Sequence, residues 1–319
     1  MAAIVGRGGA ILLGVESTYG TAVSRTVTMQ CASFSGFAEV QEWIPRNTCL
    51  RDAGFRSQHI DGRINATGKV SKCDMTYQNL GVIWYAGVGA ASSSGAGPYT
   101  HTYSTDTTLP FFTIEPIRGS AANMHLARGC TLNKLTLAME EGGPLTSEQE
   151  WNIQRTNAAA SAGSVSVGSG QSVIMYHQLG AVTINSIAQA KVKNLSIMLD
   201  NNLQERRGHG SKYTDQPEIG PERKVTVELE VEYDTVNLEL AHALNLAGTN
   251  CDVDLTFTGT GNNSLVISLY NLLCTVPPDF NVQDAGVLRH KFTMEARGDG
   301  TTNGIKFVIT NDNSSNVAN

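Results

Sequence analysis

The sequence predicts a mainly β protein that is built from two similar halves, each with one short helix. Short stretches in which apolar and polar residues alternate recur along the whole chain, as in half-buried strands. Only 16% of the 319 residues are charged, and there are 32 glycines. This composition is typical of β structure with many turns. The same order of strand, polar loop, strand, helix and strands occurs twice, which indicates a duplicated β module.

Runs of alternating or β-branched residues mark the expected strands. In the first half these are 26–32, 69–75, 111–117, 131–139 and 148–153. In the second half they are 181–187, 192–199, 224–233, 253–257, 265–270, 287–295 and 304–309.

Two stretches carry apolar residues at helical spacing instead. Helices are predicted over 77–86 and 236–247, the second capped by Asp234 or Thr235 and ended by Gly248. An apolar stripe on each helix, for example Leu238, Ala241 and Leu244, would pack on a sheet.

Gly, Ala and Ser dominate residues 87–98 and 157–172, which we expect to be flexible connections. Two long polar loops are expected at Arg46–Gly68 and Asp200–Glu222. Each exceeds the usual length of a hairpin loop.

The two helices align with Asn79 over Asn237, an offset of 237 − 79 = 158 residues. Strands after the helices align at similar offsets. We therefore predict an N-terminal arm over residues 1–24, a first module over 25–156, a linker over 157–172 and a second module over 173–319.

Composition excludes several classes of function. The net charge of −6 and the lack of Lys/Arg-rich runs argue against tight nucleic-acid binding. No apolar run reaches the ~20 residues of a membrane span. The six cysteines show no C-x-x-C spacing, so free buried thiols are expected. They are Cys31, Cys49, Cys73, Cys130, Cys251 and Cys274.

Catalytic motifs are absent from the sequence. The histidines are scattered, without H-x-H or H-E-x-x-H spacing, and no G-x-S-x-G occurs. We expect no catalytic residue, no cofactor and no metal. Glu228, Glu230 and Glu232 lie two residues apart on one face of a predicted strand. Three readings stay open for them: acid–base chemistry, a solvated outer face of a sheet, or the wall of a wet channel.

Several segments together resemble the major tail tube proteins of long-tailed bacteriophages, in particular the large, two-module kind. They are "GGAILLGVESTYGTAV" from Gly8, "LDNNLQERRGHGS" from Leu199, and "ERKVTVELEVEYD" from Glu222 with the short helix after it. The resemblance covers most of the chain as a pattern rather than as one sharp motif.

This resemblance implies two tandem β-sandwich or partial-barrel modules, each flanked by one short α-helix. It implies a structural virion protein, not an enzyme, that is made in the host cytoplasm and placed in the tail. Two modules per chain imply trimeric, pseudo-hexameric rings that stack into a hollow tube for delivery of double-stranded DNA. The implied partners are other copies of the chain and the tail terminator, tape measure and distal tail proteins, without a membrane.

Two groups of residues gain a hypothetical role from the resemblance. Glu228, Glu230 and Glu232 would face the lumen, where an acidic lining keeps DNA from sticking. The cations of the two long loops would form ion pairs between subunits or rings: Arg51, Arg56, Arg206, Arg207 and Lys212.

Three alternatives remain at this stage. A tail terminator or decoration protein would be another structural part of a virion. A secreted β-sandwich binding module would need a signal sequence. A hydrolase would need a pocket with converging acids of displaced pKa.

Overall fold

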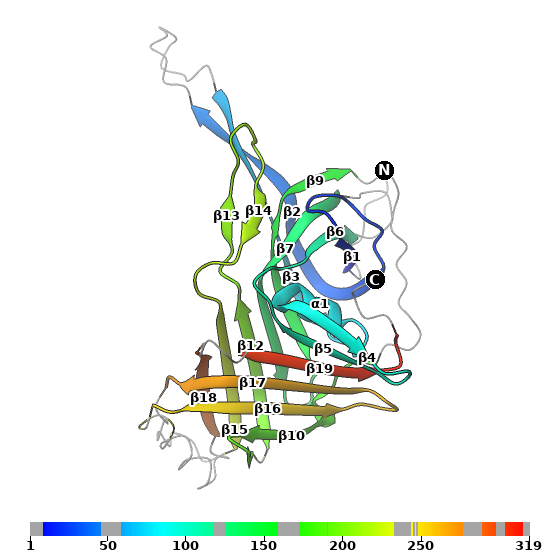
Figure 1. The fold of residues 1–319 in the computed structure, drawn as a ribbon, viewed down its shortest axis with the longest axis vertical. Coiled ribbons are helices and arrows are strands. Elements are labelled where there is room, and N and C mark those ends of the chain that lie inside the picture. Colours follow the sequence, from blue (N-terminus) through cyan, green and yellow to red (C-terminus); the bar gives the residue numbers. More distant parts are fainter. Residues whose placement is uncertain are drawn as a thin grey trace.

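The computed structural model describes residues 9–45, 59–117, 125–158, 172–189, 191–232, 244, 246, 248–276, 289–297 and 304–314. Strands dominate these residues (Figure 1), so the predicted mainly β fold is confirmed. In the first half the elements are β1 (Gly9–Glu16), β2 (Val27–Pro45), β3 (His59–Asp74), α1 (Leu80–Val88), β4 (Gly89–Ser94), β5 (Tyr99–Thr105), β6 (Phe111–Ile117), β7 (His125–Glu140), β8 (Thr146–Ile153) and β9 (Arg155–Ala158).

The second half begins with a short 3-10 turn, η1 (Tyr176–Gln178). Its strands are β10 (Leu179–Ile184), β11 (Ile187–Ala188), β12 (Val192–Asp200), β13 (Gln204–Arg206), β14 (Asp215–Glu218), β15 (Lys224–Glu232), β16 (Asn250–Thr258), β17 (Ser264–Cys274), β18 (Arg289–Ala296) and β19 (Ile305–Asn311).

Six strands of the first half close into a barrel. Each pairs with the next in the order β1, β2, β3, β8, β7 and β6, and β6 pairs back with β1. Closure leaves no unpaired sheet edge at these positions. The predicted N-terminal arm therefore includes a barrel strand, because Ile11, Leu12 and Leu13 of β1 are buried.

The second half repeats these pairings. Five strand pairs of the first half have a counterpart in the second. The pair β1–β6 corresponds to β10–β16, β2–β3 to β12–β15, and β3–β8 to β15–β18. In the same way β6–β7 corresponds to β16–β17, and β7–β8 to β17–β18. The pairs β17–β19 and β10–β11 likewise correspond to β7–β9 and β1–β2, with β11 and β12 together in the place of β2. This correspondence supports the duplication, while the predicted boundaries of the modules stay a prediction.

Two further pairings join the halves into one sheet of 17 strands. β7 pairs with β12 from Lys134 to Glu140. β5 pairs with β19, so the β4–β5 hairpin of the first half extends the sheet of the second. The core is consequently continuous across the halves.

The helix α1 is enclosed rather than laid on one sheet face. Eight of its nine residues are buried, all except Tyr85. It contains no charged residue, and a helix that is apolar on all sides is expected to be buried. Trp84 stacks on Phe307 of β19, so the helix joins the halves. No helix among the described residues is long and apolar enough to cross a membrane.

Most of the predicted second helix, 236–247, lies outside the described residues, although Leu244 and Leu246 are helical. The predicted linker likewise lies outside them, except for residues 157–158 and 172. Two loop predictions were wrong in part. Residues 89–94 form β4, and residues 59–68 belong to β3. The second polar loop contains the β13–β14 hairpin.

The cysteine prediction was partly wrong. Cys31 and Cys73 form a disulfide, because they lie directly opposite each other on β2 and β3. Sequence separation alone could not show this cross-strand pairing. Cys130, Cys251 and Cys274 are free and buried, as expected. Cys49 lies outside the described residues.

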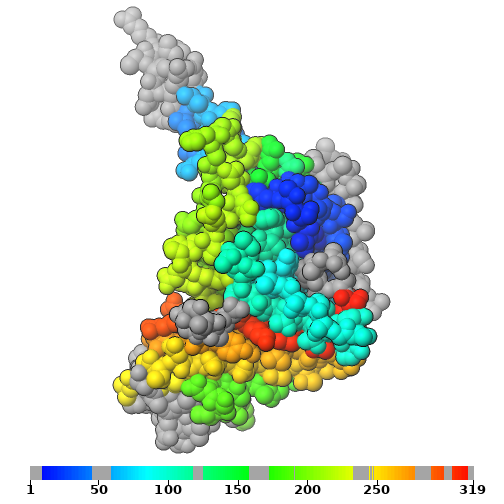
Figure 2. Space-filling model, in the orientation of Figure 1, coloured from blue at the N-terminus to red at the C-terminus, as the bar shows by residue number. Residues whose placement is uncertain are grey.

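A long arm projects from the body of the molecule. It consists of the distal parts of β2 and β3, with the β13–β14 hairpin alongside (Figures 1 and 2). The backbone N–H of Ile64 donates to the carbonyl oxygen of Lys212. The Arg155 guanidinium lies 3.8 Å from the centre of the Tyr213 ring. Each half thus contributes one hairpin to the arm.

Candidate functional surface

A polar face crosses six adjacent strands of the sheet: β3, β8, β7, β12, β15 and β18. In β15 (KVTVELEVE) the valines and Leu229 are buried, while Thr226 and the glutamates are half-exposed. The alternation arises because successive side chains of a strand point to opposite sides. We call the outward side of these strands the polar sheet face.

Charges of opposite sign alternate along one row of this face. Lys69 lies opposite Glu150, Glu150 opposite Lys134, Lys134 opposite Asp200, and Asp200 opposite Lys224. Lys69 and Glu150 form an ion pair at 3.1 Å. Cross-strand pairs of opposite charge stabilise a particular strand register. The row runs through both halves, so the face is one surface and not two.

The three glutamates of β15 lie together on this face, as the sequence predicted for one side of a strand. Each has a cationic partner in the same chain. Lys291 lies 3.0 Å from Glu228, and Arg289 lies 3.3 Å from Glu230. Lys191 and Lys193 lie 2.9 Å and 3.1 Å from Glu232. The face is therefore partly charge-compensated rather than purely acidic.

Proton binding at this end of β15 follows from the ion pairs. Hydrogen bonds from Lys191 and Lys193 lower the pKa of Glu232. Hydrogen bonds to Glu141 and Glu232 raise the pKa of Lys193. Both groups thus keep their charges over a wider pH range than they would alone. Such groups fit a stable charged surface better than a proton-transfer site, whose pKa should lie near the working pH.

The predicted loop cations lie on the arm, as far as they are described. Arg206 forms an ion pair with Glu218, and Arg207 lies 3.1 Å from Glu205. Lys212 lies 2.6 Å from Asp61 of β3. Within this one chain Lys212, and Arg207 by a hydrogen bond to the Asn65 side chain of β3, hold the two hairpins of the arm together, while Arg206 pairs within the β13–β14 hairpin. Their role between subunits stays a prediction, and Arg51 and Arg56 lie outside the described residues.

Large apolar side chains are exposed on the arm. Trp43 is 60% exposed and Val40 is 65% exposed, and Ile44 and Ile60 are exposed beside them. Sequence reasoning missed this group because no strand was expected between residue 32 and the polar loop 46–68, whereas β2 extends to Pro45. The sequence feature that could have revealed the group is the pair Trp43–Ile44 next to that loop. No alternation of apolar and polar residues there predicts that this pair is buried. Exposed apolar groups of this kind mark contact surfaces.

Two buried carboxylates fix the connection between β1 and β2. Glu16 accepts hydrogen bonds from the Thr113 hydroxyl and from the backbone N–H groups of Gly20 and Gly129. Burial nevertheless raises its pKa. Glu115 is paired with Arg25 at 2.6 Å. Because both carboxylates are buried and occupied by partners within the chain, they hold structure and are poorly placed for catalysis.

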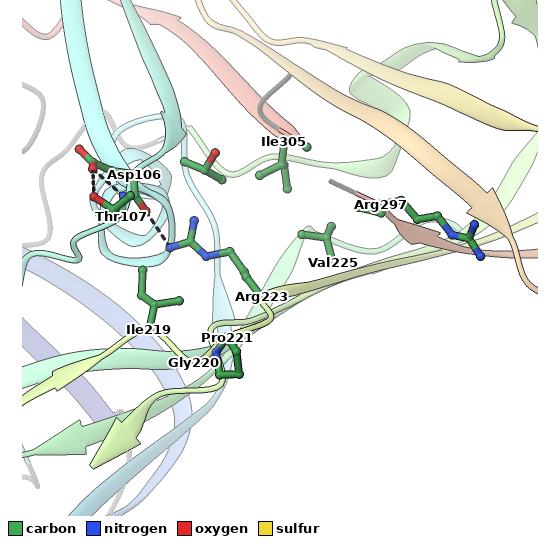
Figure 3. Close-up of a pocket in the computed structure, with 12 residues that line it drawn as sticks. Asp106, Thr107, Ile219, Gly220, Pro221, Arg223, Val225, Arg297 and Ile305 are labelled. Atoms are coloured by element: carbon green, nitrogen blue, oxygen red, sulfur yellow. Dashed lines mark hydrogen bonds between the residues drawn. The ribbon is translucent and has the colours of Figure 1, made fainter. Parts of the chain in front are cut away.

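A pocket of about 630 Å³ lies where the two halves meet (Figure 3). The Arg223 guanidinium donates to the carbonyl oxygen of Asp106, while the Asp106 carboxylate accepts from the backbone N–H of Thr107. Ile219 and Ile305 supply apolar walls. The Thr107 hydroxyl also donates to the Asp106 carboxylate at 3.2 Å, a local contact between neighbouring residues. Among the described residues no group of His, Cys, Asp and Glu could hold a metal ion.

The fold and its surfaces define a class of protein. The described residues form a closed β-barrel with further strands outside it, and the features open to a partner are a broad sheet face and a projecting arm. The chain matches the family model described as "Phage tail tube protein" over residues 6–303, and it belongs to that family. The family is structural, and its place is the tail of a virion. The comparison with curated proteins found no match.

Proposed function

We propose that this protein assembles into trimeric rings that stack into the hollow tail tube through which genomic DNA leaves the virion. The observation that carries the proposal is the polar sheet face, which runs without a break through both halves. A sheet of this width, polar on its outer side and apolar behind, can be joined to others to enclose a water-filled bore.

The size of the sheet fits the bore that DNA requires. The polar sheet face together with β2 has seven strands per chain, and three chains give about 21. At roughly 4.8 Å per strand and a tilt near 40°, the circumference is about 130 Å and the diameter about 42 Å. Side chains narrow this opening, and duplex DNA still fits.

The lining that we propose includes Glu228, Glu230 and Glu232. Their carboxylates repel phosphate, while the paired cations keep neighbouring glutamates from destabilising the sheet. A lining of this kind lets DNA pass without tight binding, because few unpaired cations are present to replace the counterions of DNA.

The lining can be tested by thiol labelling of Glu228→Cys in assembled tubes with a maleimide on a polymer too large to enter the bore. We expect slow labelling in tubes and fast labelling in the unassembled protein. The matched control is Thr258→Cys, an exposed position on β16, a strand that does not belong to the polar sheet face. Equal labelling of both positions in tubes would contradict the lining.

We propose that the arm contacts a neighbouring ring. The apolar group around Trp43 supplies the contact area, and Arg206, Arg207 and Lys212 hold the arm in shape or pair with the next subunit. Deletion of Gln204–Tyr213 should leave a folded protein that no longer polymerises, while normal tubes would refute this role. Tail terminator, tape measure and distal tail proteins then bind the tube at its ends and inside it.

Assembly itself is the direct test of the function. Negative-stain electron microscopy of the purified protein at increasing concentration should show rings and then hollow tubes. A tail terminator would instead stop at single rings, and a decoration protein or a binding module would form neither. Particles that stay monomeric at all concentrations would contradict the proposed function.

A further inference from the structure

A serine and a histidine lie against each other on the β4–β5 hairpin, which belongs neither to the polar sheet face nor to the arm. Ser93 of β4 lies directly opposite His101 of β5. The Ser93 Oγ is 2.7 Å from Nδ1 of the imidazole, which is hydrogen-bond distance. A hydroxyl that contacts an imidazole is the combination from which a nucleophile and its general base are built.

The second ring nitrogen of His101 decides which atom of this contact donates. Nε2 lies 3.0 Å from the carbonyl oxygen of Asn313. A carbonyl oxygen only accepts, so Nε2 carries the hydrogen of the neutral ring and Nδ1 is left as an acceptor. The Ser93 hydroxyl therefore donates to Nδ1. The contact with Asn313 thus holds the imidazole in the tautomer that can take a proton from Ser93.

The two side chains differ in exposure. His101 is fully buried, at 0% exposure, and its strand β5 lies between β4 and β19. Ser93 is exposed, near the end of β4. The base is therefore fixed inside the fold, while the hydroxyl that it contacts is open to a molecule from solution.

The backbone at Ser93 supplies a hydrogen-bond donor on the same side. The N–H of Asp106 donates to the carbonyl oxygen of Val88, so these two residues form a hydrogen-bonded pair. Hydrogen-bonded and non-hydrogen-bonded pairs alternate along an antiparallel ladder. Counted from Val88 and Asp106, Ser93 and His101 are a non-hydrogen-bonded pair. The N–H of Ser93 consequently points away from β5.

That side of β4 is an open edge, because among the described strands only β5 is in register with β4. The edge sequence "GAASSS" has no charged and no large side chain. An N–H group on this edge can donate to the oxygen of a carbonyl group that approaches Ser93, and such a bond stabilises the negative charge that develops during attack. The small side chains leave room for an unbranched acyl chain.

We propose that Ser93 is a nucleophile that accepts acyl groups from small carboxylic esters, with His101 as its general base. The Ser93 Oγ bonds to the ester carbonyl carbon while its proton passes to Nδ1 of His101. The bond from that carbon to the alcohol oxygen then breaks, and Nδ1 gives the proton to the departing alcohol. Water releases the acyl group by the same route, so that an ester and water give an acid and an alcohol.

Two neighbouring serines provide a control within the wild-type chain. Ser92 and Ser94 are also exposed on β4. Successive side chains of a strand point to opposite sides, so these two lie on the other side from Ser93. Their opposite residues on β5 are Thr102 and Thr100. The three serines thus share their chemistry and their exposure and differ in contact with the imidazole.

The test treats the folded protein with a fluorophosphonate and locates the label by peptide mass spectrometry. In this reaction the serine oxygen bonds to phosphorus, its proton passes to the base, and fluoride leaves. We expect label on Ser93 and only background on Ser92 and Ser94. Protein unfolded in denaturant should lose this preference. Equal labelling of the three serines in folded protein, or no label on Ser93, would overturn the proposal.

His101→Gln separates activation of the hydroxyl from its exposure. The amide can donate to the Asn313 carbonyl but supplies no basic nitrogen. Labelling of Ser93 should slow by about 100-fold or more. Unchanged labelling of a folded variant would overturn the proposal. Denaturant unfolding checks the fold, and for a variant that does not fold, the comparison of the three wild-type serines decides.

Ester hydrolysis gives a second readout. With p-nitrophenyl acetate the wild-type protein should release nitrophenolate and carry a transient acetyl group on Ser93, while Ser93→Ala should lose both and Ser92→Ala should keep both. Equal hydrolysis by wild-type and Ser93→Ala protein would contradict the proposed reaction. These measurements do not involve assembly, so their failure would leave the proposed function standing.

Discussion

The two halves of the molecule share one plan of strand pairing and differ in what is inserted into it. The first half carries the β4–β5 hairpin after its helix, and the second carries β13–β14 between β12 and β15. Each insertion serves the other half. β5 pairs with β19, and β13–β14 lies against the β2–β3 arm. The difference teaches that the duplicated modules have become mutually dependent.

The largest effect is expected when the two halves are produced as separate fragments. Fragments 1–158 and 172–319 expressed alone should fail to give a stable fold. Each exposes apolar surface that the other covers in the continuous core. Co-expression should restore a soluble complex. Circular dichroism and sedimentation would check this, and two fragments that each unfold cooperatively on their own would contradict the interdependence.

Two tryptophans with different environments test the joint between the halves. Trp84→Ala removes a fully buried ring that stacks on Phe307. It should lower the free energy of unfolding by about 3–5 kcal/mol. The matched variant Trp43→Ala removes an exposed ring on the arm. It should change the free energy of unfolding by less than about 0.5 kcal/mol. Denaturant unfolding measures both.

The variants Trp84→Ala and Trp43→Ala also distinguish an effect on the stability of the fold from an effect on tube assembly. Trp43→Ala should reduce tube formation although the variant is folded. Normal tubes from it would count against the arm contact, and similar stability losses for both variants would contradict their placement.

The disulfide allows the two halves to be compared at one equivalent pair of positions. Cys31 and Cys73 lie opposite each other on β2 and β3, as Val192 and Val231 do on β12 and β15. The double variant Cys31→Val/Cys73→Val gives the first half the pair that the second half already has. It should fold, with a loss of about 2–4 kcal/mol from the missing cross-link. Reduction of the wild-type protein should give a similar loss, and no loss in either case would contradict the bond.

A smaller effect is expected at the end of β15. Because the pKa of Glu232 is lowered in the fold, its contribution to stability is present above its ordinary value of 4.5. That contribution is lost as the pH falls through the lowered pKa. Glu232→Gln should therefore be slightly less stable near neutral pH and should converge with the wild-type protein in acid. Unfolding curves across pH 2–7 check this, and a constant difference would contradict the assignment.

Periodicity predicted much of this fold, as β6 and β8 show by their close agreement with the expected ranges. Alternation of side chains depends on the strand alone, so it can be read locally. Which strands pair depends on contacts distant in sequence. The β7–β12 seam, the β5–β19 pair and the Cys31–Cys73 bond therefore could not be predicted. β4 was missed because "GAASSS" is typical of a loop, and its pairing with β5 overrides that preference.

The candidate surface was predictable to a similar degree. The spacing of Glu228, Glu230 and Glu232 places them on one face, but their cationic partners come from other strands. Lys291 and Arg289 stand beside β15 only after β18 has paired with it. The compensated charge of the face is thus a property of tertiary structure.

The central claim is that the polar sheet face encloses the bore of a tube made from copies of this chain. The most direct measurement is an electron cryomicroscopy reconstruction of the assembled protein. We predict three chains per ring, with the carboxylates of Glu228, Glu230 and Glu232 on the inner wall. Those carboxylates on the outer surface, or an assembly without a central channel, would contradict the account.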